Sequence, residues 1–287
     1  MLSRIMKRNN LPEINFLKTP GRTSHSNQPK SPADRTKSSK RKKDSLRQKS
    51  SETFKAIFIA LFAALVLRQF VIASYNVPTG SMKDTILVGD FMFVNKFIYG
   101  ARTPRWLGIP FSDIGFEIPF VRFPAIAEPK RTDIVVFDYP KDIKLDYIKR
   151  CVAVGGQTVE VKSGTLYVDN QLEGKYTPLD RRFDPEERFN VAYTHVTPEK
   201  GFPYTIRHFV TSGFRRDDMP QRTVPANHFF MMGDNRDNSL DSRSWGYVPR
   251  ENVVGKPLMT WLSWNGMTPG YRFYDKIRWE RLGMVIR

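Results

Sequence analysis

Apolar residues are distributed in two distinct ways along the chain, and the first is a single long run near the N-terminus. Residues 56–67 are uninterrupted apolar, and residues 70–73 resume the run after Arg68 and Gln69. As a helix the stretch 56–73 is about 27 Å long, close to the hydrocarbon thickness of a bilayer. Arg68 lies off-centre, and its long side chain can reach the interface. The pattern predicts one transmembrane helix over residues 53–75; the alternative is an unusually apolar core helix.

Beyond residue 75 the apolar runs become short and are separated by turn-forming residues. Residues 134–137, 229–232 and 253–261 read as strands, and residues 158–168 read as a hairpin with a glycine turn. No helical period of comparable strength follows the first run, so the fold class is mainly β. The chain is therefore divided into an arm, a helix and a core in two parts around an insertion or subdomain, over residues 1–52, 53–75, 76–170, 171–223 and 224–287.

Charge changes this picture only at the N-terminus. The chain has a formal net charge of +17, and residues 1–50 contain 14 Lys or Arg residues against three acidic ones. With few large apolar residues, residues 1–52 are expected to form a disordered basic arm. Because most of the charge lies in this arm, no nucleic-acid partner is expected. The positive-inside rule predicts a single-pass protein with its N-terminus in the cytoplasm and its catalytic domain on the outer, periplasmic side of the inner membrane.

Three segments are candidates for chemistry, and each is ambiguous alone. Residues 77–90 form a Pro–Gly loop that contains Ser81, and most such serines are turn residues. Residues 146–154 form a strand in which Lys149 shares a face with apolar neighbours, which would lower a lysine pKa. Residues 232–246 are rich in Asp, Asn and Ser, but they fit no EF-hand register. Cys151 is the only cysteine, which excludes an intramolecular disulfide.

Together and in this order, the three segments resemble bacterial type I signal peptidases. The resemblance rests on G-D-N-R-D-N-S-x-D-S-R at 233–243, on P-T-G-S-M at 78–82 and on Y-I-K-R at 147–150. It implies an antiparallel-sheet catalytic domain behind one N-terminal transmembrane helix. It also implies a membrane-bound serine endopeptidase that removes signal peptides from exported preproteins through an acyl-enzyme. Such an enzyme needs no metal or cofactor.

The resemblance also implies roles for individual residues. Ser81 would be the nucleophile and Lys149 its unprotonated base, a Ser–Lys variant of the serine-protease triad. The Ser81 backbone N–H and the Thr79 hydroxyl would form the oxyanion hole. Ser239 would hydrogen-bond the Lys149 amine, and Asp241 and Arg243 would pair to hold that loop. The substrate pocket would be bordered by Met82, Val77, Ile86, Tyr147 and Ile148, for which core packing is the alternative.

Several turn positions depart from the family pattern. Asp84 stands where the family often has Pro, Thr132 stands where it has Gly, and residues 154–157 replace its usual L-P-G-D. These changes fall in loops and leave Ser81, Lys149 and Ser239 in place.

The expected partners are exported preproteins with small residues one and three positions before the cut, together with the lipid bilayer. Two alternatives stay open: a LexA-like self-cleaving Ser–Lys protein, and a non-enzymatic membrane-anchored β module. The identity of the precursors and the roles of residues 105–123 and 171–223 are not determined by these patterns.

Overall fold

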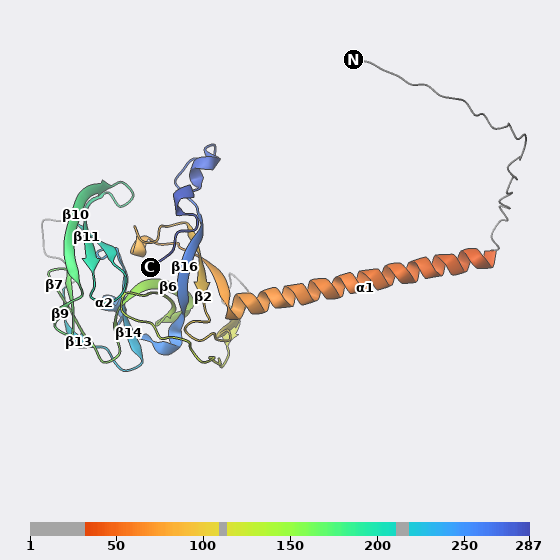
Figure 1. Ribbon diagram of the computed structural model, residues 1–287, viewed down its shortest axis with the longest axis horizontal. Coiled ribbons are helices and arrows are strands. Elements are labelled where there is room, and N and C mark those ends of the chain that lie inside the picture. Colours follow the sequence, from red (N-terminus) through yellow and green to blue (C-terminus); the bar gives the residue numbers. More distant parts are fainter. Residues whose placement is uncertain (1–31, 109–113, 211–217) are drawn as a thin grey trace, which may run out of the picture. The chain divides into compact units, whose positions relative to one another are not determined.

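The structure is a computed structural model that describes residues 32–108, 114–210 and 218–287 of the chain. Its contacts divide the chain into two compact units, Met1–Phe58 and Ile59–Arg287. In the described part of the first unit the chain is helical. The second unit begins with the end of that helix and contains every strand of the described residues (Figure 1).

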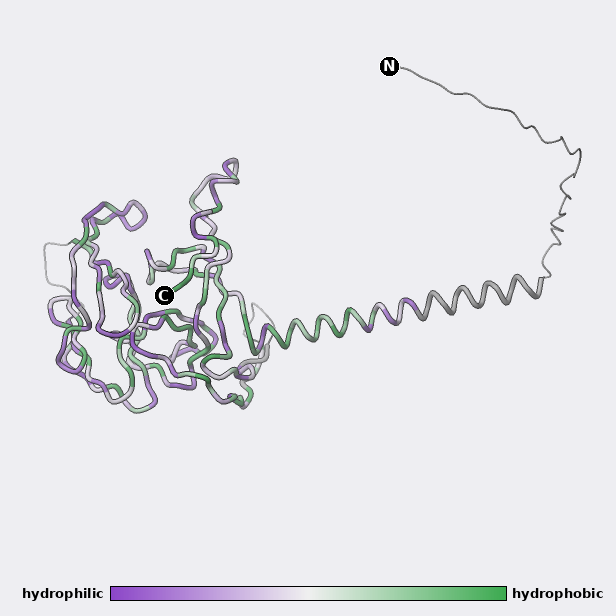
Figure 2. The backbone as a smooth tube through the Cα atoms, in the orientation of Figure 1, coloured by the Kyte–Doolittle hydropathy of each residue, from purple (hydrophilic) through white to green (hydrophobic). Residues whose placement is uncertain are grey.

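The helix α1 extends from Pro32 to Phe70 and differs from the prediction at both ends. Residues 32–52, expected to belong to a disordered arm, are helical, whereas residues 1–31 of that arm lie outside the described residues. Proline is favoured at the first helical position, and no other Pro or Gly interrupts the segment. The stretch Lys49–Phe70, with a mean hydropathy of 1.7, is long and apolar enough to cross a membrane. Figure 2 shows the described part of α1 becoming hydrophobic toward its C-terminal end.

The helix ends five residues earlier than predicted because the following residues form a strand. Residues Ile72–Asn76 make up β1, which pairs antiparallel with β2, Asp90–Asn95. Apolar side chains alone could not distinguish the last turn of a helix from a short strand. The backbone hydrogen bonds that β2 offers decide the outcome.

The main sheet has seven strands in the order β1-β2-β16-β5-β6-β14-β15, and every neighbouring pair is antiparallel. Buried apolar residues on β2, β5, β14 and β16 form much of the core. The predicted strands are present, which confirms the mainly β, antiparallel fold class. Their bounds are Ile134–Tyr139 for β5, Asp142–Val154 for β6, His228–Met232 for β14, Val248–Pro249 for β15 and Val253–Ser263 for β16.

The predicted hairpin forms part of a second, four-stranded sheet in the order β13-β7-β8-β9. Ser163 and Gly164 both have positive φ, 51° and 73°, which suits the tight turn of a hairpin. The bounds are Thr158–Lys162 for β7, Thr165–Val168 for β8, Gln171–Leu172 for β9 and Met219–Thr223 for β13.

The segment expected as an insertion, 171–223, contains a separate three-stranded sheet, β10-β11-β12. Both ends of that segment, β9 and β13, belong to the four-stranded sheet instead. The bounds of the separate sheet are Lys175–Asp184 for β10, Phe189–Thr197 for β11 and Tyr204–Phe209 for β12. The shorter elements are β3 Trp106–Gly108, β4 Gly115–Glu117, α2 Ser242–Trp245 and the 3-10 turns η1 Gly80–Met82, η2 Arg250–Asn252, η3 Phe273–Lys276 and η4 Trp279–Arg281.

Candidate active site

Ser81 lies in η1, a short 3-10 helix of one turn that follows β1. Thr79 precedes the turn in extended conformation, and Lys83 N–H closes it on the Gly80 carbonyl at 3.0 Å. The Ile86 N–H donates to the Met82 carbonyl at 2.7 Å, which continues the ordered loop. The Pro–Gly composition of the segment thus gives a tight turn, and Ser81 is only 7% exposed within it.

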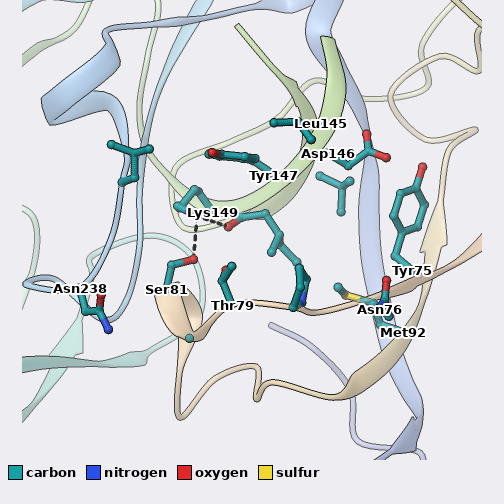
Figure 3. A pocket seen from close by; sticks show the side chains of 15 residues that line it. Tyr75, Asn76, Thr79, Ser81, Met92, Leu145, Asp146, Tyr147, Lys149 and Asn238 are labelled. Carbon is teal, nitrogen blue, oxygen red and sulfur yellow. Dashed lines mark hydrogen bonds between the residues drawn. The ribbon is translucent and has the colours of Figure 1, made fainter. Parts of the chain in front are cut away.

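Lys149 reaches Ser81 from β6, with Val135 of β5 opposite it in the sheet. Its Nζ lies 2.7 Å from Ser81 Oγ and 3.0 Å from the Ile148 carbonyl oxygen. The Tyr147 ring lies on its other side, 5.2 Å from Nζ to the ring centroid. Figure 3 shows the Ser81 and Lys149 side chains pointing toward one another. The two residues that the sequence separates by 68 positions are therefore in hydrogen-bond contact.

Burial sets the protonation of this amine. Lys149 is 3% exposed, and loss of water lowers its pKa from 10.5 to about 8, although the nearby charges of Asp241 and Asp234 act in the opposite direction. Among the described residues, no carboxylate hydrogen-bonds or ion-pairs with this amine. The neutral form, which can accept a proton, is therefore accessible at mildly basic pH.

The segment that begins at Gly233 connects the serine loop to the lysine strand. Asn235 N–H donates to the Ser81 carbonyl at 3.1 Å, and Asn235 Nδ2 donates to the Gly80 carbonyl at 3.0 Å. Asp234 accepts both Nε and Nη2 of Arg150, at 2.8 and 2.7 Å. A Cβ atom at Gly233 would lie only 2.5 Å from the Ser81 carbonyl oxygen, so only glycine allows this approach.

These anchoring residues were missed by sequence reasoning. The density of Asp and Asn in 234–238 was the available signal, but Asx-rich segments usually form their own turns. Nothing local indicated that Asp234 would pair with Arg150, or that Asn235 would hold the serine loop.

Asp241 and Arg243 form the expected pair. Asp241 is fully buried and accepts Arg243 Nε at 2.9 Å and Nη2 at 2.8 Å. The Gly233 N–H also donates to it, at 3.1 Å. Burial acts to raise the pKa of Asp241, but the hydrogen bonds and charge of Arg243 outweigh it and hold that pKa below its ordinary value. The pair fixes the loop as an ion pair, as expected for residues beside the site.

Ser239 does not make the expected hydrogen bond to Lys149. Its hydroxyl is buried and interacts with the Asp241 carboxylate, whose pKa it helps to lower. It lies against Gly233, where an added Cβ would come within 2.3 Å of it. The Lys149 amine is satisfied instead by Ser81 and by the carbonyl of its own neighbour, Ile148.

A cavity of about 540 Å³ opens beside Ser81 and Lys149. Of the five residues predicted to border it, Tyr147 and Ile148 do so. Val77, Met82 and Ile86 are instead packed in a core cluster and are at most 2% exposed. The apolar side chains of that loop anchor it to the core, which is the alternative considered for them. Thr79 lines the cavity, and so do residues that were not predicted, namely Tyr75, Asn76, Pro78, Gly80, Met92, Val136, Leu145, Asp146, Asn238 and Leu240.

The arrangement combines a buried hydroxyl, an amine with a lowered pKa and an open cavity, which suits nucleophilic attack on a carbonyl group. Within the described residues, no group of three or more His, Cys, Asp or Glu side chains is arranged to hold a metal ion.

Comparison with known proteins gives the family. The family described as "Signal peptidase, peptidase S26" matches residues 50–264. Signal peptidase I of Pseudomonas aeruginosa is 36% identical over 243 residues, covering 80% of this chain and 78% of the relative. Signal peptidase I of Aquifex aeolicus is 31% identical and covers 72% of this chain and 82% of the relative. A crystal structure of a signal peptidase I from Enterococcus faecalis is 26% identical and covers 45% of this chain, with a TM-score of 0.27.

The match to the family extends over most of the chain and includes the loop, the strand and the Gly233 segment that meet at the cavity. It excludes the non-enzymatic β module considered from the sequence. The chain belongs to the signal peptidase family, peptidase S26, and is a peptidase.

Proposed function

We propose that this protein cleaves N-terminal signal peptides from exported preproteins, with Ser81 as nucleophile and Lys149 as general base. The observation that carries the proposal is the 2.7 Å contact between Lys149 Nζ and Ser81 Oγ, made by an amine that has no carboxylate partner among the described residues. A serine hydroxyl needs such a base because it must lose its proton as it attacks.

The reaction would proceed in two halves. Ser81 Oγ attacks the scissile carbonyl carbon while its proton passes to Lys149 Nζ. The Ser81 N–H and the Thr79 hydroxyl would stabilise the oxyanion; Thr79 lies beside Ser81 along the cavity wall. The C–N bond then breaks, Lys149 returns the proton to the leaving amine, and the signal peptide stays esterified to Ser81. Water, deprotonated by Lys149, hydrolyses that ester.

The substrate would bind in extended conformation. Residues from the end of β1 line one side of the cavity, and Leu145–Lys149 of β6 line the other. An extended peptide between two such segments can hydrogen-bond to both backbones, which gives affinity without regard to side chains. We propose that the cavity selects small residues one and three positions before the cut.

We also propose that α1 anchors the enzyme in the bacterial inner membrane. The span Lys49–Phe70 has the length and hydropathy required, and the Lys- and Arg-rich residues before it favour a cytoplasmic N-terminus. The catalytic core, residues 76–170 and 224–287, would then lie on the periplasmic side, where exported precursors emerge.

The decisive experiment is precursor cleavage by the full chain in detergent, with Ser81→Ala and Lys149→Ala as test variants. We expect both variants to lose cleavage while their circular dichroism spectra match wild type. Lys162→Ala, at an exposed lysine on β7, is the matched control and should cleave normally. Full activity of either test variant would contradict the mechanism. Cleavage of the enzyme itself, with the precursor left intact, would favour the LexA-like alternative.

A further inference from the structure

The loop that follows Ser81 has a backbone conformation that the family's usual residue could not adopt. Asp84, which stands where these enzymes often have Pro, has a φ of +76°. The proline ring restricts φ to about −65°. The loop is therefore ordered here by something other than a proline ring, and the contacts of Lys83 and Asp84 indicate what that is.

Lys83 forms ion pairs with the last residue of β10 and with the turn that follows it. Its Nζ lies 2.8 Å from Asp184 Oδ2 and 2.5 Å from Glu186 Oε2. The Lys83 side chain is 11% exposed and that of Asp184 is 7% exposed, so this contact is largely shielded from water. The three-stranded sheet thus touches the chain two residues after Ser81.

Arg207 of β12 makes the second set of contacts. Its Nη1 donates to Asp84 at 3.1 Å, and its Nη2 donates to Asp184 at 2.6 Å and to Glu187 at 2.9 Å. Arg207 is 1% exposed. Its backbone N–H also donates to the Asp234 carbonyl at 3.0 Å, which joins β12 to the segment that holds the serine loop.

Glu187 extends these contacts to the cavity. Its Oε1 accepts Asn235 Nδ2 at 2.8 Å and Asn238 Nδ2 at 3.1 Å. The same Asn235 amide donates to the Gly80 carbonyl, and Asn238 lines the cavity. The turn between β10 and β11 therefore supports both the nucleophile's turn and one wall of the site.

We propose that the β10-β11-β12 sheet positions the nucleophile through an ionic clamp, made of Lys83, Asp84, Asp184, Glu187 and Arg207. The clamp holds the loop after Ser81 at the geometry that keeps Ser81 Oγ within reach of Lys149. Arg207 and Glu187 are thus positioning residues, since neither touches the nucleophile itself. This inference rests on the proposed role of Ser81, and it gives the segment expected as an insertion a part in catalysis.

The first test is Arg207→Met, with amide hydrogen exchange as a readout that does not depend on activity. We expect exchange at Lys83, Thr85 and Ile86, whose N–H groups close the loop, to become at least about tenfold faster relative to the buried Cys151 amide of β6, which donates to the Asp133 carbonyl. For precursor cleavage we expect kcat to fall about 10- to 100-fold, with a smaller change in KM. The pH below which the rate declines should stay unchanged, because Lys149 is not altered. Arg207→Lys should recover part of the kcat.

Arg181→Met is the matched control, because Arg181 is an exposed cation on β10 of the same sheet. It should leave both exchange and kcat unchanged. If Arg207→Met accelerates exchange equally at Cys151 and in the loop, it acts only through global stability, and the clamp is refuted. If exchange in the loop is unchanged, the clamp is refuted whether or not Ser81 is the nucleophile.

The second test separates the backbone of Asp84 from its ion pair. Asp84→Gly can keep the positive φ while it removes the side chain with its carboxylate, so we expect kcat to fall by less than about tenfold. Asp84→Pro must change the backbone, and we expect kcat to fall at least about 100-fold, although Pro is the residue that the family pattern often has there. Wild-type activity in Asp84→Pro would overturn the proposal.

Discussion

Lys149 and Arg150 are adjacent on β6, are both almost completely buried, and have opposite electrostatic surroundings. Lys149 is held by a hydroxyl and a carbonyl, and burial lowers its pKa to about 8. Burial also acts to lower the pKa of Arg150, but the bidentate contact with Asp234 outweighs it and leaves that pKa above its ordinary value.

The difference shows that burial alone does not decide whether a cation is lost. Successive residues of a strand point to opposite faces, so one step along β6 moves a side chain from the cavity to the packed interior. On the cavity face an amine without a carboxylate partner can become a base. On the other face a permanently charged guanidinium with two hydrogen bonds to one carboxylate holds the segment in place.

The largest expected effect comes from placing a permanent positive charge on the cavity face of β6, as Arg150 does on the opposite face. Lys149→Arg would place a permanently charged group beside Ser81, and we expect kcat/KM for precursor cleavage to fall by about 1,000-fold. The loss should match that of Lys149→Ala at every pH, because neither variant supplies a base. Activity within about tenfold of wild type would show that Lys149 does not need to be neutral.

The next effect comes from breaking the Arg150 pair. Arg150→Met leaves Asp234 buried and unpaired, and we expect the free energy of unfolding to fall by about 3–5 kcal/mol. Chemical denaturation of the variant would measure this.

Arg272→Met, at an exposed ion pair with Asp275, is the control and should change stability by less than about 1 kcal/mol. The double variant Arg150→Met with Asp234→Leu should recover part of the loss, since no charge is then left buried. No recovery would place the cost of Arg150→Met in lost packing rather than in the unpaired carboxylate.

Lys149 should instead cost stability. Its pKa is about 8 in the folded state and 10.5 in the unfolded state, so between these values only the unfolded state holds the proton and stability rises with pH. Below pH 8 the buried, protonated Lys149 lowers the free energy of unfolding by about 3 kcal/mol relative to its value above pH 10.5. Lys149→Met should therefore be more stable than wild type by up to about this amount at pH 7. The advantage should shrink above pH 8 and be absent above pH 10.5. A constant difference across this range would contradict the lowered pKa.

The smallest effect concerns the pH at which Lys149 becomes neutral. In wild type, kcat/KM should rise about tenfold per pH unit below a limb near pH 8. The charge of Asp241 raises the pKa of Lys149, so Asp241→Asn should move the limb to lower pH. A limb that stays in place would mean that another group controls the rate. Thr79→Ser, which keeps the hydroxyl, should leave the limb where it is.

Much of this site follows from local pattern. The hairpin at 158–168, the strand around 134–137 and the strand that contains Lys149 are visible as short apolar or alternating runs between turns. The sequence motif at residues 233–243 indicated the family, and the comparisons with known proteins confirm it. The predicted C-terminal end of the helix was wrong because the apolar residues after Phe70 suit a helix and a strand equally well.

The sequence by itself therefore determined the fold class and the family, and it indicated a candidate membrane span and two candidate catalytic residues. Tertiary structure alone decided that Ser239 does not hydrogen-bond Lys149, that Arg150 pairs with Asp234, and that Met82 and its neighbours pack in the core. It also decided that β10 and β12 contact the loop after Ser81. The physical reason is the separation along the chain. Periodicity and turn-forming residues determine structure over a few neighbouring residues, whereas each of these contacts joins distant segments that only packing brings together.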